Sequence, residues 1–338
     1  MDAYYASPDT SFYDSTLERK FYEQKLRHIG YKPYPNDGLV TFGASGTNMC
    51  DRQLYFKNDK GTRAEKSADI PFRGRQRRQG TAVVDYVQLD ILHMPKRLGK
   101  SAPFTMAVRD NGEWDFEDAA QERRVLTHPH PETGELISFA ITAKPDGKFD
   151  YAPDGSRIIF EYKTKASGLR PMNGKLDYKG AQDDHKRQVV AESLVFGIDE
   201  ALIVYESTHK PSWFSDEESS SVTKGQKTWK EGAPLTDMRA FYVRITDVMK
   251  TQLLNDLARQ AALVYAGEVP SVTVEMTDKC GFCAFRGHCA ATLSAGNLAL
   301  LQRAESAMAH GSMAGKAAHK SLRNYLAGVT EISEEEAA

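Results

Sequence analysis

The sequence is poor in cysteine, has no long apolar run and carries almost no net charge. No stretch of the 338 residues approaches the roughly 18 apolar residues of a membrane-spanning helix. The first residues lack a basic region followed by an apolar run, so we expect no signal peptide and a cytoplasmic location. In a reducing cytoplasm, four cysteines are more often metal ligands or buried thiols than disulfides. A net charge of −2 excludes a general attraction to polyanions, so any nucleic-acid binding must come from local basic patches.

Hydrophobic residues make up 41% of the chain, enough for one large core or for a core with a smaller module attached. We expect three parts: an N-terminal docking segment over 1–40, a main domain over 41–290, and a C-terminal helical extension with an acidic tail over 291–338. Residues 207–235 are rich in Ser, Lys, Glu and Gly and are expected to form a mobile insertion in the main domain.

Hydrophobic periodicity predicts alternating helices and strands in the main domain. Helices are expected over 15–29, 79–92, 182–196 and 246–266, and strands over 122–126, 136–143, 157–163, 201–205 and 241–245. The small-residue loop 41–48 precedes a helix, and Cys50 is expected in its first turn. This order predicts an α/β fold with a mixed central sheet flanked by helices.

Two carboxylates and a lysine form the first candidate site. Asp146 follows a predicted strand in a Pro-Asp-Gly turn, and Glu161 and Lys163 lie two residues apart on the next strand, so their side chains point to one face. Two carboxylates, a backbone carbonyl and waters suit Mg²⁺ or Mn²⁺, which can polarise a phosphoryl oxygen and activate a water molecule. Lys163 could position that water or neutralise developing negative charge. The alternative is an ordinary surface hairpin.

The cysteines form the second candidate site. Cys280, Cys283 and Cys289 have the spacing C-x2-C-x5-C, which lets three thiolates meet at one metal centre, and only the fold can bring Cys50 to them. Four thiolates hold either a [4Fe–4S] cluster or a tetrahedral zinc ion, and the spacing does not choose between them. Buried cysteines without a metal are the remaining alternative.

The stretch from Pro145 to Lys163 resembles the PD-(D/E)xK nuclease superfamily, whose pattern is an Asp near a Pro or Gly, then a spacer, then Asp/Glu-x-Lys. The resemblance implies a restriction-endonuclease-like core. In the RecB-like branch, a helix after the lysine carries a glutamine, and the segment 185–190 matches that helix. It implies that Gln188 is a site residue that supports Lys163 or the DNA backbone.

The chain departs from that pattern at one position. RecB-like members often carry Gly-x-x-x-His on the helix before the sheet, with the histidine as a metal ligand, whereas Gly80 is followed by Val84 at that position. Asp85 is the candidate replacement, although a shift of one residue turns a helix position by about 100°. Loss of the ligand is also compatible with an altered metal dependence or weak activity.

The split cysteine pattern is similar to that of the iron-staple nucleases, namely the AddB nuclease domain and the CRISPR-associated exonuclease that trims spacer precursors. In these families one cysteine precedes the core and three follow it. The similarity covers roughly residues 43–290 and implies a [4Fe–4S] cluster rather than zinc. Such a cluster would tie the helix after Cys50 to the C-terminal segment, in a structural rather than a redox role.

Basic residues before the first core helix and around the candidate site could follow a phosphate backbone, with Tyr162, Phe149 or Tyr151 available for base stacking. The basic residues are Arg73, Arg75, Arg77, Arg78, Lys165, Lys186 and Arg187.

These observations together predict a metal-dependent DNA exonuclease acting on ends or single strands, in recombination, repair or CRISPR-type end processing. The chain has no G-x-x-x-x-G-K-[ST] motif, so a motor would come from a recombination or helicase partner protein. One rival is a DNA-binding or assembly module that retains the fold without catalysis. The other rival is a zinc-stabilised interaction protein.

Overall fold

The computed structural model describes residues 1–5, 14–30, 34–35, 37–59, 61–65, 71–209, 236–272, 280, 283–308, 319–320 and 322–327. The expected insertion over 207–235, beyond residue 209, and the acidic end of the tail lie outside these ranges. Within them, no helix has the length and apolarity needed to cross a bilayer.

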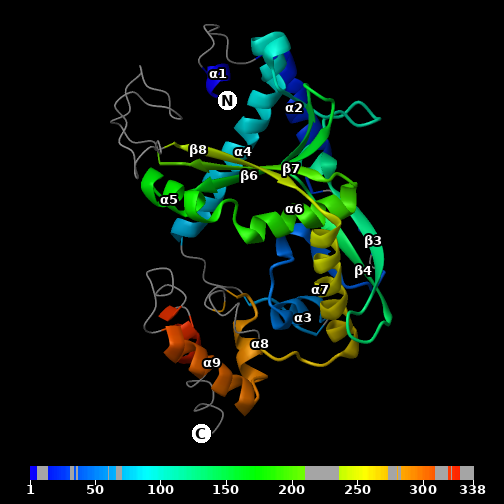
Figure 1. Ribbon diagram of the computed structural model, residues 1–338, viewed down its shortest axis with the longest axis vertical. Helices are drawn as coiled ribbons and strands as arrows, with labels where there is room; N and C mark the ends of the chain where they lie inside the picture. The colour runs from blue at the N-terminus through cyan, green and yellow to red at the C-terminus, as the bar shows by residue number, and fades with distance from the viewer. Residues whose placement is uncertain are drawn as a thin grey trace.

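The described residues form a mixed α/β fold (Figure 1). The α-helices are α1 Asp2–Tyr5, α2 Ser15–His28, α3 Asp51–Asn58, α4 Pro71–Leu98, α5 Leu169–Lys179, α6 Asp183–Phe196, α7 Asp247–Ala266, α8 Arg286–Ala291 and α9 Ala295–Met308. The strands are β1 Thr41–Gly43, β2 Phe104–Met106, β3 Glu122–Pro129, β4 Leu136–Ala143, β5 Gly147–Tyr151, β6 Arg157–Lys165, β7 Glu200–Ser207 and β8 Met238–Arg244. Short 3₁₀ helices lie at η1 Ala44–Gly46, η2 Gly99–Ser101 and η3 Glu117–Ala120.

The strands form two mixed sheets. The smaller sheet has the order β1-β4-β3, in which β1 and β4 are parallel and β4 and β3 are antiparallel. The larger sheet has the order β2-β5-β6-β7-β8, in which only the central pair β6 and β7 is parallel. The prediction of a mixed sheet flanked by helices is therefore confirmed in its general form. The single sheet that was expected is instead divided in two: β3 and β4 lie in the smaller sheet and β6 in the larger one, and the chain passes from one sheet to the other at Pro145-Asp146.

Each face of the larger sheet packs against a different helix. Phe160 and Tyr162 of β6 join the apolar cluster that α4 builds with Val84 and Val87. Ile159 of the same strand joins the opposite cluster, which contains residues of α6 and α7. Because successive strand residues point to opposite faces, Glu161 and Lys163 belong to the α6 face.

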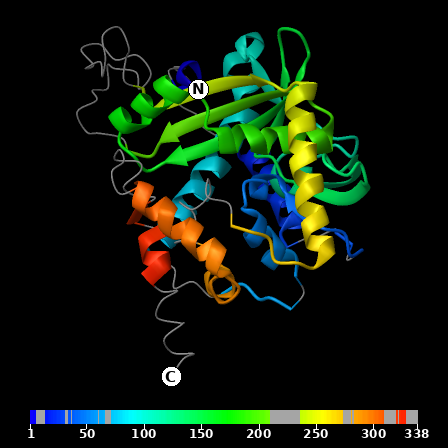
Figure 2. The same ribbon diagram turned by 60° about the horizontal axis from the view of Figure 1, so that its bottom comes forward.

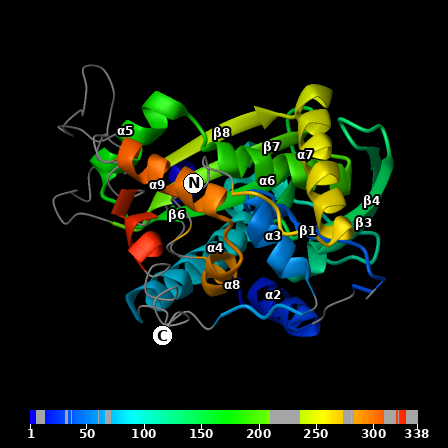
Figure 3. The same cartoon turned by 90° about the horizontal axis from the view of Figure 1, so that it is seen from below.

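The C-terminal part has a small core of its own. Leu301, Ala304, Leu322 and Tyr325 pack together, with Cys280 and Cys289 against them. Figures 1 and 2 show α8 and α9 on the side of the molecule away from β8. Seen from below, α8 lies next to α3 (Figure 3), and the Phe56 ring of α3 stacks on Phe285 just before α8. Helix α3 therefore connects the main core to the C-terminal part.

The structure confirms the predicted helices at α2, α6 and α7 and the predicted strands β3, β4, β6, β7 and β8, with ends that differ by a few residues. Two expectations need correction. The helix expected over 79–92 is the C-terminal part of α4, which begins at Pro71. Cys50 is not inside a helix; it is the N-cap of α3, and its sulfur accepts the Gln53 amide hydrogen at 3.4 Å.

Candidate functional site

The carboxylates and lysine predicted from the sequence meet at the junction of β5, β6 and α6. Asp146 precedes β5, and its Oδ2 accepts the backbone amide hydrogen of Tyr162 at 2.6 Å. Lys163 forms an ion pair with Glu161 Oε1 and donates to Gln188 Oε1 at 3.0 Å. Register within β6 and one turn of α6 thus bring Glu161, Lys163 and Gln188 into direct contact.

Burial disfavours the charged forms of the carboxylates in this group. Burial and the neighbouring Glu161 carboxylate raise the pKa of Asp146 well above its ordinary value. Burial also raises the pKa of Glu161, although Lys163 acts in the opposite direction. The pKa of Lys163 is lowered by burial, but the Glu161 carboxylate more than offsets this and the pKa is raised overall. A second positive charge at this place would relieve the repulsion between the carboxylates.

The carboxylates have the donor set that a divalent cation needs. Glu161 is 2% exposed, and within the described part of the chain its Oε2 has no hydrogen-bond partner. A buried carboxylate oxygen without a partner is costly unless a cation or water satisfies it. No group of three or more His, Cys, Asp or Glu side chains among the described residues is arranged around one ion, so Asp146 and Glu161 would share the ion with waters, as is common for Mg²⁺.

Three residues near this group were not singled out from the sequence. Gln88 of α4 donates to the carbonyl oxygen of Asp146 at 2.7 Å. Glu117 of η3 has a φ of 48°, and its charge acts on both Asp146 and Glu161. Glu192 of α6 accepts from Gln188 Nε2 at 3.0 Å. The spacing of Gln188 and Glu192 could have revealed the last contact, since positions i and i+4 share a helix face; the positions of Gln88 and Glu117 depend on tertiary packing.

The proposed replacement for the family histidine is not at the site. Asp85 forms an ion pair with Lys25 of α2 and is therefore turned toward that helix. Val84 is buried in the apolar cluster on the α4 face of the sheet, opposite the face of Glu161. Helix geometry explains the result, because one residue changes the direction of a side chain by about 100°. The expectation that Asp85 serves as a metal ligand is wrong for this arrangement.

The predicted DNA-contacting residues fall into two groups. Arg75 and Arg78 line an open hollow of about 680 Å³ together with Thr208 and His209, where the ends of β6 and β7 approach α4. Arg77 lies in the same turns of α4, and the side chain of Arg73 lies outside the described residues. Arg75 and Arg78 therefore lie on a surface that a phosphate backbone could contact.

The side chains of the second group contact other residues of the protein. Lys186 pairs with Asp183 at 2.6 Å, and Arg187 donates to the Thr47 carbonyl at 3.0 Å and pairs with Asp256 at 2.7 Å. Tyr162 is 4% exposed with its hydroxyl on Glu206, so it cannot stack on a base; that expectation is wrong because the side chain points into the α4 face.

Lys165 extends the site along β6. Its ammonium lies 5.1 Å from the centre of the Tyr205 ring. Burial and the charge of Lys175 lower the pKa of Lys165 to about 8. Nδ1 of His185 is 2.8 Å from the Tyr205 hydroxyl, which also accepts the Gln182 amide hydrogen at 2.9 Å. Burial and the charge of Lys163 lower the pKa of His185 to about 4, so His185 is neutral near pH 7.

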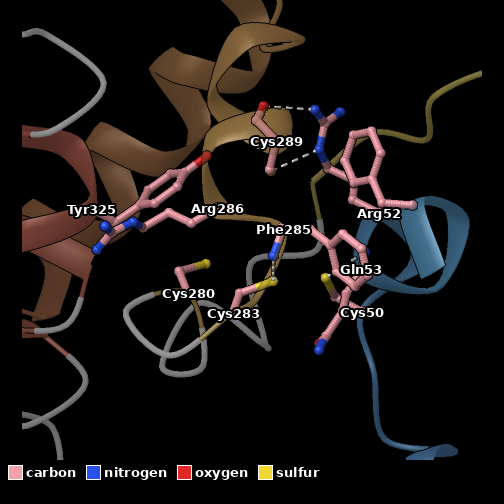
Figure 4. Close-up of a pocket in the computed structure, with 10 residues that line it drawn as sticks. Cys50, Arg52, Gln53, Cys280, Cys283, Phe285, Arg286, Cys289 and Tyr325 are labelled. Atoms are coloured by element: carbon pink, nitrogen blue, oxygen red, sulfur yellow. Dashed lines mark hydrogen bonds between the residues drawn. The ribbon is translucent and has the colours of Figure 1, made fainter. Parts of the chain in front are cut away.

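The four cysteines line one pocket of about 400 Å³ (Figure 4). Cys50 comes from the start of α3, Cys289 from α8, and Cys280 and Cys283 from the segment before α8. All four are free thiols. Burial raises the pKa of Cys50, and burial raises the pKa of Cys283 to about 11. The described residues therefore bring the predicted set around one space without showing a metal centre.

Hydrogen-bond donors surround the sulfur atoms. Arg52 is 2% exposed and donates through Nε to Cys289 Sγ at 3.1 Å, with further bonds to the Pro270 and Cys289 carbonyl oxygens. The Phe285 amide donates to Cys283 Sγ at 3.5 Å. A buried guanidinium and backbone amides stabilise thiolate more than thiol. The pocket thus has the donors that a thiolate-held metal centre requires.

Comparison with known proteins gives only distant likenesses. No protein-family model matches the chain, and no curated protein does so either. The protein SSO0001 has a crystal structure that aligns with 83% of this chain and 98% of its own at 13% identity and a TM-score of 0.41. The alkaline exonuclease LHK-Exo from Laribacter hongkongensis aligns with 68% of this chain and 90% of its own, at 13% identity and a TM-score of 0.36.

A phage related exonuclease from Haemophilus somnus 129PT aligns with 44% of this chain and 61% of its own, at 15% identity and a TM-score of 0.23. Two of these three proteins are thus exonucleases. Likenesses of this degree do not establish a family, and the function of this chain has to be argued from its own residues.

The lowered pKa of His185 predicts a stability that depends on pH. Below pH 6.5 the unfolded chain binds a proton on this histidine, whereas the folded protein does not until the pH nears 4. The free energy of unfolding should therefore decrease as the pH is lowered from 6.5 to 4, and His185 should account for at most about 3 kcal/mol of this decrease. His185→Asn keeps an acceptor for Tyr205 and should lose less stability over this range in urea titrations. His130→Asn, at a turn, is the control; equal pH dependence in wild type and His185→Asn would contradict the assignment.

Proposed function

We propose that this protein is a metal-dependent DNA nuclease, and specifically an exonuclease that acts on ends or single strands. The observation that carries the proposal is the contact group of Glu161, Lys163 and Gln188 beside Asp146, in which the buried Glu161 Oε2 lacks a partner among the described residues. The resemblance of Pro145-Asp146 and Glu161-Tyr162-Lys163 to the PD-(D/E)xK pattern supports it. A role in recombination or repair, with a motor as partner, follows from that resemblance alone.

Each residue of this contact group has a role in cleavage that follows from its chemistry. Asp146 and Glu161 would hold Mg²⁺ or Mn²⁺, which supplies charge stabilisation at the phosphate and lowers the pKa of a bound water. Lys163 keeps its proton because Glu161 raises its pKa, and so it carries a fixed positive charge toward the phosphate. Gln188 accepts from the Lys163 ammonium at 3.0 Å and limits its freedom. The protein's share of catalysis is thus positioning and electrostatic stabilisation of the developing charge.

The hollow beside α4 supports nucleic acid as the substrate. Arg75 and Arg78 line it, and it opens at the end of β6, the strand that carries Glu161 and Lys163. The hollow is open to solvent, unlike the enclosed pockets that take small organic ligands, and two arginines are among the residues that line it. Two arginines on one helix offer bidentate donors to successive phosphates.

We further propose that the cysteine pocket holds a [4Fe–4S] cluster. All four cysteines line one pocket, which is the arrangement that either a [4Fe–4S] cluster or a zinc ion needs. The resemblance of the split cysteine pattern to the iron-staple nucleases supports the cluster over zinc. The cluster would be structural, since Arg52 and Cys289, which lie 237 residues apart in the sequence, meet at its edge.

Lys163→Ala should abolish divalent-dependent DNA cleavage without unfolding the protein. The expected loss is on the order of 10²-fold or more, because a charge that stabilises the transition state is removed from a buried site. The assay is degradation of end-labelled single- and double-stranded DNA with Mg²⁺ or Mn²⁺ by protein purified under anaerobic conditions. Lys96→Ala removes an exposed lysine that pairs with Asp14 and is the control. If wild type binds DNA without cutting it, the protein is a binding module on this fold.

Arg75→Ala combined with Arg78→Ala should weaken DNA binding and make it less sensitive to salt. Each phosphate contact that is lost should reduce the slope of log K against log salt concentration by about 1. Fluorescence anisotropy of a labelled oligonucleotide at several salt concentrations measures both effects. Arg303→Ala removes an exposed arginine of α9 and is the matched control. An unchanged slope in the double variant would place the DNA elsewhere.

The cysteine pocket predicts a coloured protein. Wild type purified under anaerobic conditions should be brown and contain iron and sulfide, and Cys283→Ala should lose the colour, the iron and part of the stability, because ligand binding is coupled to folding. Metal analysis and thermal unfolding measure these properties, with Ser306→Ala, at an exposed position of α9, as the control. A colourless wild type with one zinc per chain would support a zinc-stabilised pocket. A Cys283→Ala variant that is fully folded and active would show that the proposed cluster has no structural role.

A further inference from the structure

Glu192 is a buried carboxylate that the function proposed above does not use. It lies on α6 one turn after Gln188, and its relative exposure is 0%. Its Oε1 accepts the Gln188 Nε2 hydrogen at 3.0 Å, and its Oε2 has no hydrogen-bond partner within the described ranges. The charges of Glu161, Asp146 and Lys163 all act on it. A carboxylate at such a place is costly to bury, so its retention calls for a specific role.

The amide of Gln188 contacts a different residue at each end, and Gln188 also hydrogen-bonds to Glu161. Its oxygen faces the Lys163 ammonium, which can only donate hydrogen bonds, and its nitrogen faces the Glu192 carboxylate, which accepts. The sequence of contacts runs from Glu161 through Lys163 and Gln188 to Glu192. An acceptor at the last position favours the amide orientation that the lysine requires.

We propose that Glu192 is the positioning residue for Lys163 and acts through Gln188. By accepting from Nε2, Glu192 keeps the Gln188 oxygen directed at Lys163 Nζ. Without this acceptor, the amide could rotate and bring its NH₂ group against the ammonium, which would release the lysine from one of its two partners. The role rests on the proposed nuclease function, because the position of Lys163 matters for catalysis only if Lys163 serves the scissile phosphate.

The position of Glu192 fits an indirect role better than direct contact with the substrate. It has no exposed surface, and Gln188, itself only 7% exposed, is the residue that it contacts through a hydrogen bond. Both residues lie on one face of α6, whose neighbours Val189 and Val190 are in the main core. The pair therefore moves as part of a packed helix, which is the rigid support that a positioned lysine needs.

The first test compares two substitutions of Glu192 in the Mg²⁺-dependent cleavage assay. Glu192→Leu removes the acceptor and should lower kcat by about 10- to 100-fold, with KM for DNA unchanged. Glu192→Gln retains a carbonyl oxygen that can accept from Gln188 and should keep kcat within about 3-fold of wild type. Cooperative unfolding of each variant establishes that it folds. A purely structural role predicts no such rescue by the amide.

A double-mutant cycle tests whether Glu192 acts through Gln188. Gln188→Leu and Glu192→Leu should each lower kcat, but adding Glu192→Leu to Gln188→Leu should cost nothing more, because the connecting amide is already gone. Additive losses would overturn the proposal. A loss in Glu192→Gln as large as that in Glu192→Leu, with a higher Mg²⁺ concentration needed for half-maximal rate, would also overturn it and identify Glu192 as a cation ligand.

A measurement independent of cleavage separates this proposal from the nuclease function. The side-chain NH₂ signals of Gln188 can be recorded in ¹⁵N-glutamine-labelled protein and assigned by their absence in Gln188→Leu. They should be sharp and shifted from the exposed glutamines in wild type and Glu192→Gln, and averaged in Glu192→Leu. Unchanged signals in Glu192→Leu would refute the positioning role even if wild type cuts DNA. If the wild-type protein gives sharp signals that depend on Glu192 and yet cuts no DNA, the contact between Glu192 and Gln188 exists, but it does not serve catalysis.

Discussion

The alternation of side chains along β6 is the constraint on which the rest of the molecule depends. This strand lies at the centre of the larger sheet, paired in parallel with β7, and presents a different chemistry to each side. Phe160 and Tyr162 enter the core against α4, and Glu161 and Lys163 meet α6 on the other face. A slip of one residue in register would exchange the two sets and bury the ion pair in an apolar cluster. The identities of these four residues therefore specify both the fold and the site.

The position of α6 follows from the same strand. Its apolar residues Val189, Val190 and Val195 complete the main core, and this packing fixes the rotation of the helix about its axis. Gln188 is then directed at Lys163. The polar residues of the site are thus positioned by apolar contacts around them, which explains how such a concentration of charge can be held in place.

The local parts of this arrangement could be predicted from the sequence. Period-two and helical patterns located β6, β7, α6 and α7, and the spacing of Glu161 and Lys163 was sufficient to place them on one face. The neighbours of Asp146 could not be predicted, because Gln88 and Glu117 reach it from segments far away in the chain. Alternation along β6 places Tyr162 on the face opposite Glu161 and Lys163, but the pattern could not show that α4 buries this face. The direction of Asp85 depends on the contact of α4 with α2 and could not be predicted either. The division into two sheets was likewise invisible, because strand patterns do not report pairing partners.

The cysteine pocket joins segments from opposite ends of the sequence, and protein contacts already hold it together. Arg52 donates to the carbonyl of Cys289 at 2.9 Å and to that of Pro270 at 2.7 Å. Glu65 contributes from a third segment, accepting the amide hydrogen of His288 at 3.2 Å. The cysteines therefore approach one another through contacts between protein groups, and the chain itself specifies this junction.

The raised thiol pKa values in that pocket have a consequence for the life of the newly folded chain. A thiol whose pKa is about 11, as for Cys283, is almost entirely protonated at neutral pH, and thiolate rather than thiol attacks disulfides and peroxides. Cys50 and Cys283, whose pKa values are raised by burial, are thus poor nucleophiles although they lie around a common space with two further cysteines. Burial therefore slows cross-linking and oxidation at these two thiols.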